Sequence, residues 1–270
     1  MSQGPEAYID KSRRLKDDDT FCFSCTPDKS CFTSCCYDLS LILTPYDIFR
    51  LKNHLDMKSG DFLKRYTTIY VGQNSGLPVV TLKMEDPYLK CPFLEEGKGC
   101  RVYKDRPGAC RTYPLARMAC RSQDREGVEE FYYIVREPDC EGFRDGKEWT
   151  VRNWKENEGL EPYNEMNDIF GEILQAKTVS GIANLNADQI DIFHVGCYDV
   201  DRFRQYFLEG PNLDRYMESE EVIEAISNDE KALLKYGMRW VKKKLFQPGV
   251  VWPVPPGSVC EGRRPPCYHS

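Results

Sequence analysis

The chain has 270 residues, of which 41% are hydrophobic and 30% charged, and its formal net charge is -6 at pH 7. These values are typical of a globular protein that can bury its own core without disulfides. The negative charge argues against a nucleic-acid binder that neutralises phosphates and against a polybasic membrane contact, so we expect no nucleic-acid partner and no membrane partner.

The first 20 residues are polar, and no apolar run approaches the roughly 20 residues needed to cross a bilayer. We identify no signal peptide there and expect a flexible segment at 1–20 in a soluble, cytoplasmic protein. In that compartment the thirteen cysteines need an explanation. Disulfides are rare in the reducing cytosol, where clustered cysteines more often bind metal or carry out redox chemistry.

The first chemical feature along the chain is a run of four cysteines within twelve residues: Cys25, Cys31, Cys35 and Cys36. Pro, Asp and Ser residues between them favour tight turns that bring thiols together. The pattern favours a metal site, with buried or unpaired thiols as the alternative. On an extended backbone, the sulfurs of Cys35 and Cys36 would point opposite ways and serve different metals or different edges of one cluster.

Helix signals follow this run. Thr44 is a good N-cap, with proline next and Asp47 three residues after the cap, so we expect a helix over 44–57. A second short helix is expected to start at Ser59, with one apolar face formed by Phe62, Leu63 and Tyr66.

Short strands are predicted at 78–84 and 130–135, where residues are β-branched or aromatic. Apolar residues then recur at helical spacing in 148–156, 163–183, 188–208 and 219–245. We therefore expect an α+β fold, in which a small, loop-rich, Cys-dense metal core with a few short strands is backed by a layer of helices. The expected domains are 21–147 for the Cys-rich part, 148–247 for the helical layer and 248–270 for a Pro-rich tail.

A second group of cysteines lies in Cys91-Pro-Phe-Leu, Cys100-Arg-Val-Tyr and Arg106-Pro-Gly-Ala-Cys110-Arg-Thr-Tyr-Pro. Together with the run that ends in Cys35-Cys36, these blocks resemble the YkgJ-type cysteine-cluster family, a zinc- or iron-chelating domain of the CxxCxxCC type. The resemblance covers most of the chain, and the Arg-Pro-x-x-Cys-Arg block is its most specific part. It implies eight metal ligands: Cys25, Cys31, Cys35, Cys36, Cys91, Cys100, Cys110 and Cys140.

Eight thiolates are enough for two four-coordinate sites, or for one cluster with spare ligands. Arg106 and Arg111 flank Cys110, where their charge would offset that of the thiolates and lower the thiol pKa. We expect both arginines to support the metal site rather than to catalyse. An iron–sulfur cluster is slightly favoured, since all candidate ligands are thiolates, but zinc held by four cysteines is an equally valid arrangement.

Three functions follow from these ligands. The first is an iron–sulfur protein with a redox or electron-transfer role and a protein partner. The second is a structural zinc-binding interaction module without catalysis. The third is a metal-dependent protein-modifying enzyme, because the family includes relatives joined to a flagellin lysine methylase; the chain contains no Gly-x-Gly-x-x-Gly loop, which counts against it.

The remaining cysteines are interpreted as spare thiols. Cys22 forms a Cys-x-x-Cys with Cys25, and a redox-active pair is the alternative for it. The other four fall outside the two groups assigned to metal: Cys120, Cys197, Cys260 and Cys267. The three isolated histidines are interpreted as structural or solvated, and no catalytic residue stands out.

Overall fold

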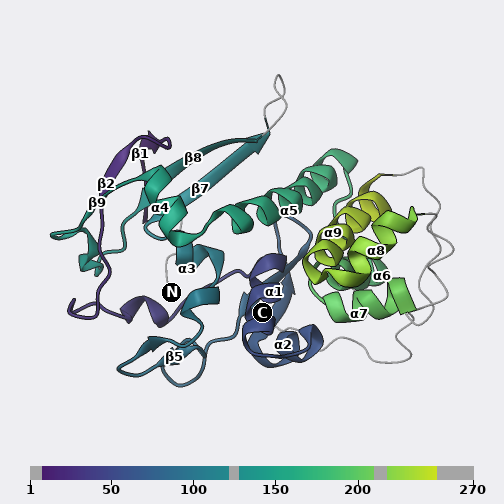
Figure 1. Cartoon of the computed structure of the whole chain (residues 1–270), viewed down its shortest axis with the longest axis horizontal. Helices are drawn as coiled ribbons and strands as arrows, with labels where there is room; N and C mark the ends of the chain where they lie inside the picture. The colour runs from purple at the N-terminus through teal and green to yellow at the C-terminus, as the bar shows by residue number, and fades with distance from the viewer. Residues whose placement is uncertain (1–7, 122–127, 210–217, 248–270) are drawn as a thin grey trace. The chain divides into compact units, whose positions relative to one another are not determined.

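A computed structural model describes residues 8–121, 128–209 and 218–247. They form an α+β fold of several helices and small sheets, which confirms the predicted fold class. The chain divides into two compact units (Figure 1). The first unit runs through Tyr70 and continues from Val79 to Gly171, and the second takes Val71–Pro78 and continues from Glu172.

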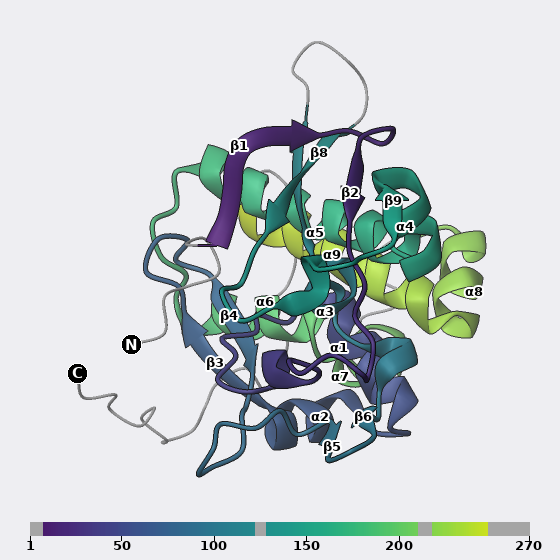
Figure 2. The same cartoon turned by 90° about the vertical axis from the view of Figure 1, so that its left-hand side faces the viewer.

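An antiparallel sheet in the order β1–β8–β7 belongs to the first unit, and Figure 2 shows β1 and β8 side by side. Its strands are β1 (Ile9–Leu15), β7 (Leu115–Arg121) and β8 (Val128–Val135). β8 confirms the strand predicted at 130–135. β1 gives regular structure to part of the segment that we expected to be flexible, because its backbone pairs with β8, with Ile9 opposite Val135. Strand pairing of this kind depends on a partner more than a hundred residues away.

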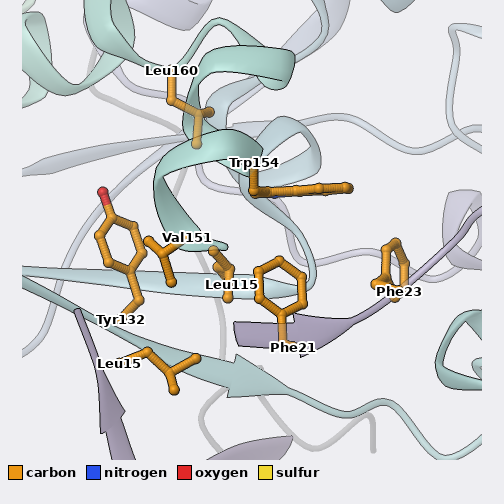
Figure 3. Close-up of a cluster of buried hydrophobic side chains, with 8 residues drawn as sticks. All are labelled: Leu15, Phe21, Phe23, Leu115, Tyr132, Val151, Trp154 and Leu160. Atoms are coloured by element: carbon orange, nitrogen blue, oxygen red, sulfur yellow. The ribbon is translucent and has the colours of Figure 1, made fainter. Parts of the chain in front are cut away.

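A hydrophobic core cluster of the first unit lies where α4 (Val151–Glu158) packs on strands (Figure 3). β2 (Thr20–Cys22) pairs with β9 (Glu148–Thr150) just before this helix, and the Thr150 side chain caps it. Trp154 packs edge-on against the ring of Phe23, with centroids 5.7 Å apart. The buried members of the core are Leu15, Phe21, Phe23, Leu115, Tyr132, Val151, Trp154 and Leu160.

Two predicted helices are confirmed in the first unit. α1 (Pro45–His54) begins with the expected capping box between Thr44 and Asp47. α2 (Ser59–Tyr66) buries the expected apolar face, Phe62, Leu63 and Tyr66. The strand predicted at 78–84 is β4 (Pro78–Leu82), which pairs with β3 (Thr67–Val71).

The cysteines of this unit lie on short elements and loops. These elements are the hairpin of β5 (Leu94–Glu95) and β6 (Gly99–Cys100), helix α3 (Gly108–Thr112), and the 3-10 helices Ser34–Cys36, Tyr103–Asp105 and Glu141–Phe143. None of them has a periodic apolar pattern long enough to be recognised from sequence.

The predicted helices of the back half are present, with two corrections. α5 (Glu161–Ser180) starts near the predicted position, whereas the predicted helix 188–208 is broken after α6 (Ala187–Cys197) and resumes as α7 (Val200–Arg204) and a π-helix (Gln205–Glu209). The predicted helix 219–245 is two helices, α8 (Glu220–Asn228) and α9 (Glu230–Phe246). The break lies at Asp229, whose extended backbone ends α8 and whose side chain caps α9.

Helices α6 and α9 approach closely in the second unit, because glycines face each other there. A Cβ at Gly237 would lie 2.4 Å from the carbonyl oxygen of Gly196, so only residues without a side chain fit. Within the described residues, no helix is long and apolar enough to span a membrane. The segment 248–270 lies outside the described residues, and the division into domains at 1–20, 21–147, 148–247 and 248–270 stays a prediction.

Candidate metal centre

The first cysteine run winds through consecutive turns. The N–H of Ser34 donates to the carbonyl oxygen of Cys31 (3.0 Å), and the N–H of Cys36 donates to that of Thr33 (2.8 Å). Cys35 and Cys36 therefore lie in the 3-10 helix Ser34–Cys36 rather than on extended backbone. Their thiols hydrogen-bond to each other, which lowers the pKa of Cys35 and raises that of Cys36. The extended backbone, from which opposed sulfurs were expected, does not occur.

The second cysteine group is joined directly to the first run. The backbone N–H of Cys91 donates to the carbonyl oxygen of Cys36 (2.8 Å). Burial raises the pKa of the Cys91 thiol to about 11, and a hydrogen bond from the N–H of Phe93 partly offsets this. Cys100 repeats the arrangement: burial raises its thiol pKa and the N–H of Val102, again two residues later, lowers it. Backbone N–H groups aimed at sulfur stabilise a thiolate, and therefore suit a metal-bound cysteine.

Cys140 comes from the start of the 3-10 helix Glu141–Phe143, which lies against the first run. The N–H of Glu141 donates to the Sγ of Cys31 (3.2 Å), and the hydroxyl of Ser30 donates to the carboxylate of Glu141 (2.7 Å). The carbonyl of Gly142 accepts from the N–H of Ser24 (2.8 Å). These contacts bring Cys140 to the first run from more than a hundred residues away in sequence.

Cys110 is placed by a buried carboxylate that sequence reasoning missed as part of the site. Asp47 is 2% exposed, and its Oδ1 accepts the N–H of Gly108 at the start of α3 (2.7 Å). Its Oδ2 accepts both the N–H and the hydroxyl of Thr44 (2.8 and 2.9 Å). Burial raises the pKa of Asp47, and these hydrogen bonds and the charge of Arg111 oppose the rise. One side chain thus caps α1 and holds the turn that carries Cys110.

The thiols of all eight predicted ligands take part in one electrostatic network. The pKa of Cys25 is raised to about 11, mainly by burial. The negative charges of three neighbouring thiolates add to the rise: Cys35, Cys140 and Cys31. The hydrogen bond to Cys35 is the largest cause that raises the pKa of Cys36, and burial is the second. The charges of Cys35, Cys91 and Cys110 add to this rise.

Burial is also the main cause at Cys110, where Cys91, Cys35 and Cys100 act in the same direction. The network therefore links all eight thiols, and Cys35 is shared most widely, since its charge acts on Cys25, Cys36, Cys100 and Cys110.

The donor chemistry of this network fits a thiophilic metal. Mutually repelling thiolates raise one another's pKa, and a bound cation would relieve that repulsion. Within residues 8–121, 128–209 and 218–247, no group of three or more His, Cys, Asp or Glu side chains is arranged so that it could hold a metal ion as it stands. The thiols interact with one another without a formed coordination sphere. A preformed site is not required, since metal binding and local ordering are commonly coupled.

The two predicted supporting arginines differ in their surroundings. Arg106 is paired with Glu158 and stacks on the ring of Tyr103. Burial raises the pKa of both Cys25 and Cys100, and the charge of Arg106 opposes that rise. Arg111 donates to the backbone carbonyls of Glu158 and Lys104, and its charge acts on Asp47 and Tyr163. The supporting roles of both residues stay predictions.

The remaining cysteines lie elsewhere. Cys22 is exposed on β2, and Cys197 is buried in α6 of the second unit. Burial raises the pKa of Cys197 well above its ordinary value. Cys120 lies on β7, and Cys260 and Cys267 fall outside the described residues. Of the histidines, His54 is in hydrogen-bonding contact with Asp105 (2.8 Å), whereas burial lowers the pKa of His194.

Comparison with known proteins gives one family match, which covers the cysteine-rich part of the chain. Residues 24–141 match the family model CxxCxxCC, described as a putative zinc- or iron-chelating domain. The matched segment contains all eight predicted ligands and leaves out Cys22 and Cys197. No curated protein and no solved structure shows a significant match to the chain. The match over residues 24–141 confirms the resemblance to the cysteine-cluster family that the sequence blocks suggested.

Proposed function

We propose that the CxxCxxCC domain holds an iron–sulfur cluster through its clustered cysteines and that the protein transfers electrons to or from a protein partner. The observation that carries this proposal is the electrostatic network of eight thiols drawn from four separate stretches of the chain. An all-sulfur donor set is the typical ligand set of iron–sulfur clusters.

Eight thiols are enough for two sets of four ligands, and we propose one such assignment. Four cysteines complete the ligand set of a four-iron, four-sulfur cluster or of a structural zinc ion. We assign Cys25, Cys31, Cys35 and Cys140 to one site. Cys36, Cys91, Cys100 and Cys110 form the other. The hydrogen-bonded pair of Cys35 and Cys36 would join them.

The chain's own residues have distinct tasks in this proposal. The thiolates bind the metal, and the backbone N–H groups of Phe93, Val102 and Glu141 donate to sulfur and stabilise the anionic form. Arg106 adds a positive charge near Cys25 and Cys100. The bound cluster would supply a reversible one-electron step, whose potential depends on these hydrogen bonds and on solvent exposure.

A structural zinc module without catalysis is the second candidate. The family description names zinc and iron equally, and two four-cysteine groups suit two zinc ions as well as they suit clusters. In either case we place the protein in the cytoplasm, because an oxidising compartment would favour disulfides among such close thiols. A protein partner for electron transfer or docking belongs to the same proposal.

The deciding experiment is anaerobic purification, followed by the visible absorption spectrum and by iron, zinc and acid-labile sulfide per chain. Matched iron and sulfide in a brown protein, with a reversible reduction wave, is the expected result. A colourless protein with one or two zinc ions would contradict the iron–sulfur proposal and support the structural zinc module instead. A protein free of both metals would end the metal-centre proposal.

Variants of single cysteines test the ligand assignment. Cys110→Ser is expected to lower the metal content substantially, because it removes a ligand that interacts with three others. Cys22→Ser is the matched control, since Cys22 is an exposed neighbour outside the matched segment. Arg111→Ala tests the supporting role of that residue, which would be abandoned if metal content and cluster stability stayed unchanged.

A further inference from the structure

A cavity of about 340 Å³ opens in the first unit beside the second cysteine group. Its volume lies at the lower end of the range for small-molecule sites, roughly 300–1,000 Å³. The wall is made by the end of α2, the segment after β4 and the residues that follow Cys91 and Cys100. The lining residues are Arg65, Tyr66, Lys83, Met84, Glu85, Asp86, Pro92 and Arg101.

Three basic residues line the cavity, Arg65, Lys83 and Arg101, and the two arginines are held in place around Tyr66. Arg101 donates to the hydroxyl of Tyr66 (3.3 Å), and its guanidinium lies 5.4 Å from the centre of the Phe93 ring. Arg65 lies 5.1 Å from the centre of the Tyr66 ring itself. The backbone N–H of Lys83 donates to the carbonyl of Tyr66 (2.8 Å), which fixes where the third basic side chain begins.

None of these three cations has an acidic partner in the part of the chain that the structure describes: no salt bridge joins Arg65, Lys83 or Arg101 to a carboxylate there. Glu85 and Asp86 line the same cavity but are not paired with them. Elsewhere in the unit, basic side chains close to carboxylates do pair, as Arg50 does with Asp105. The basic and acidic side chains that line the cavity are therefore not paired with one another. A ligand that fills the cavity would meet the guanidinium groups of Arg65 and Arg101 without a carboxylate bound to them.

We propose that this cavity binds a small molecule through an oxyanion, a phosphate or a carboxylate, held by Arg65 and Arg101. Planar guanidinium groups match both anions by paired hydrogen bonds, and stacking on aromatic rings reduces the entropy lost when they bind. Glu85 and Asp86 at the same cavity disfavour an extended polyanion, so the ligand is a small molecule rather than nucleic acid. The inference does not depend on which metal the cysteines hold.

The test measures binding of inorganic phosphate and of acetate to the full-length protein by calorimetry, at low and at moderate salt. The matched variants are Arg65→Gln and Lys64→Gln, which each remove one charge from the last turn of α2. Lys64 is exposed and does not line the cavity. Arg65 is exposed and does not belong to the thiol network. We therefore expect Arg65→Gln to keep the fold and the metal content of the parent, and both are measured to check that the variant is intact.

Saturable binding of either anion that weakens at least tenfold in Arg65→Gln, and stays within twofold of the parent in Lys64→Gln, is the expected result. Tighter phosphate binding identifies a phosphorylated ligand, and tighter acetate binding a carboxylic acid. The proposal is overturned if neither anion binds saturably, or if both variants lose affinity equally, since that pattern reports only diffuse charge. Arg101→Gln should reproduce the effect of Arg65→Gln; full binding by both arginine variants would also overturn it.

Discussion

Replacing Asp47 by alanine tests how the structure positions Cys110. The substitution leaves three donors without their acceptor: the N–H of Gly108 and the N–H and hydroxyl of Thr44. An unsatisfied buried N–H costs about 1–3 kcal/mol, and loss of a helix cap costs about 1 kcal/mol more. We therefore expect a local destabilisation of about 3 kcal/mol at α1 and α3.

Hydrogen exchange measured by mass spectrometry provides a local readout of this change. Since each 1.4 kcal/mol is a factor of ten, protection of the peptides that contain α1 and Gly108 should fall about 100-fold. Asp61→Ala is the control, because Asp61 is an exposed acid in the first turn of α2, where substitution changes stability by about 0.5 kcal/mol or less. A fall of less than about threefold in Asp47→Ala, or an equal fall in the control, would refute the reasoning.

Three further predictions concern pH and packing. Burial pushes the pKa of Glu130 up, but Lys155 and Arg117 hold the pKa below its ordinary value of 4.5. The ionised Glu130 therefore stabilises the folded protein above pH 4.5, and this stabilisation is lost as the pH falls through the lower pKa of the folded state. Urea unfolding of Glu130→Gln should therefore show reduced stability at neutral pH and a flatter acid limb than Glu129→Gln, whose side chain is exposed; parallel profiles would contradict this. Because burial and neighbouring thiols raise the pKa of most of the cluster, to about 11 at Cys25, metal binding must displace protons. Affinity in a chelator competition should rise with pH towards that value, and a pH-independent affinity would remove the argument. Gly142→Ala places a Cβ 2.3 Å from the ring of Phe23 and should lower the melting temperature at a cost of about 1–3 kcal/mol, whereas Gly171→Ala, with open space around it in α5, should stabilise by about 0.5–1 kcal/mol; equal effects would show that the packing argument is wrong.

Much of the local structure was predictable because its signals lie within one helical turn. Thr44 and Asp47 mark the start of α1, and the spacing of Phe62, Leu63 and Tyr66 gives the buried face of α2. The same local signals could not show that Asp229 divides the last predicted helix, since an aspartate in a charged helix pattern is equally compatible with a solvated face. The cysteine blocks also pointed to the family whose model matches residues 24–141, because the residues that carry the resemblance lie in short stretches of sequence.

The sequence by itself determined the residue types of the site: thiols in short, turn-rich spacings, with basic residues beside Cys110. Only the tertiary structure decided which of them meet. The N–H of Cys91 pairs with the carbonyl of Cys36, Glu141 donates to Cys31, and Asp47 reaches Gly108 across 61 positions of sequence. Such contacts leave no local trace, because they follow from how separately formed elements pack and satisfy their buried polar groups. The cavity between Arg65 and Arg101 has the same origin, since neither residue is informative until Tyr66 lies between them.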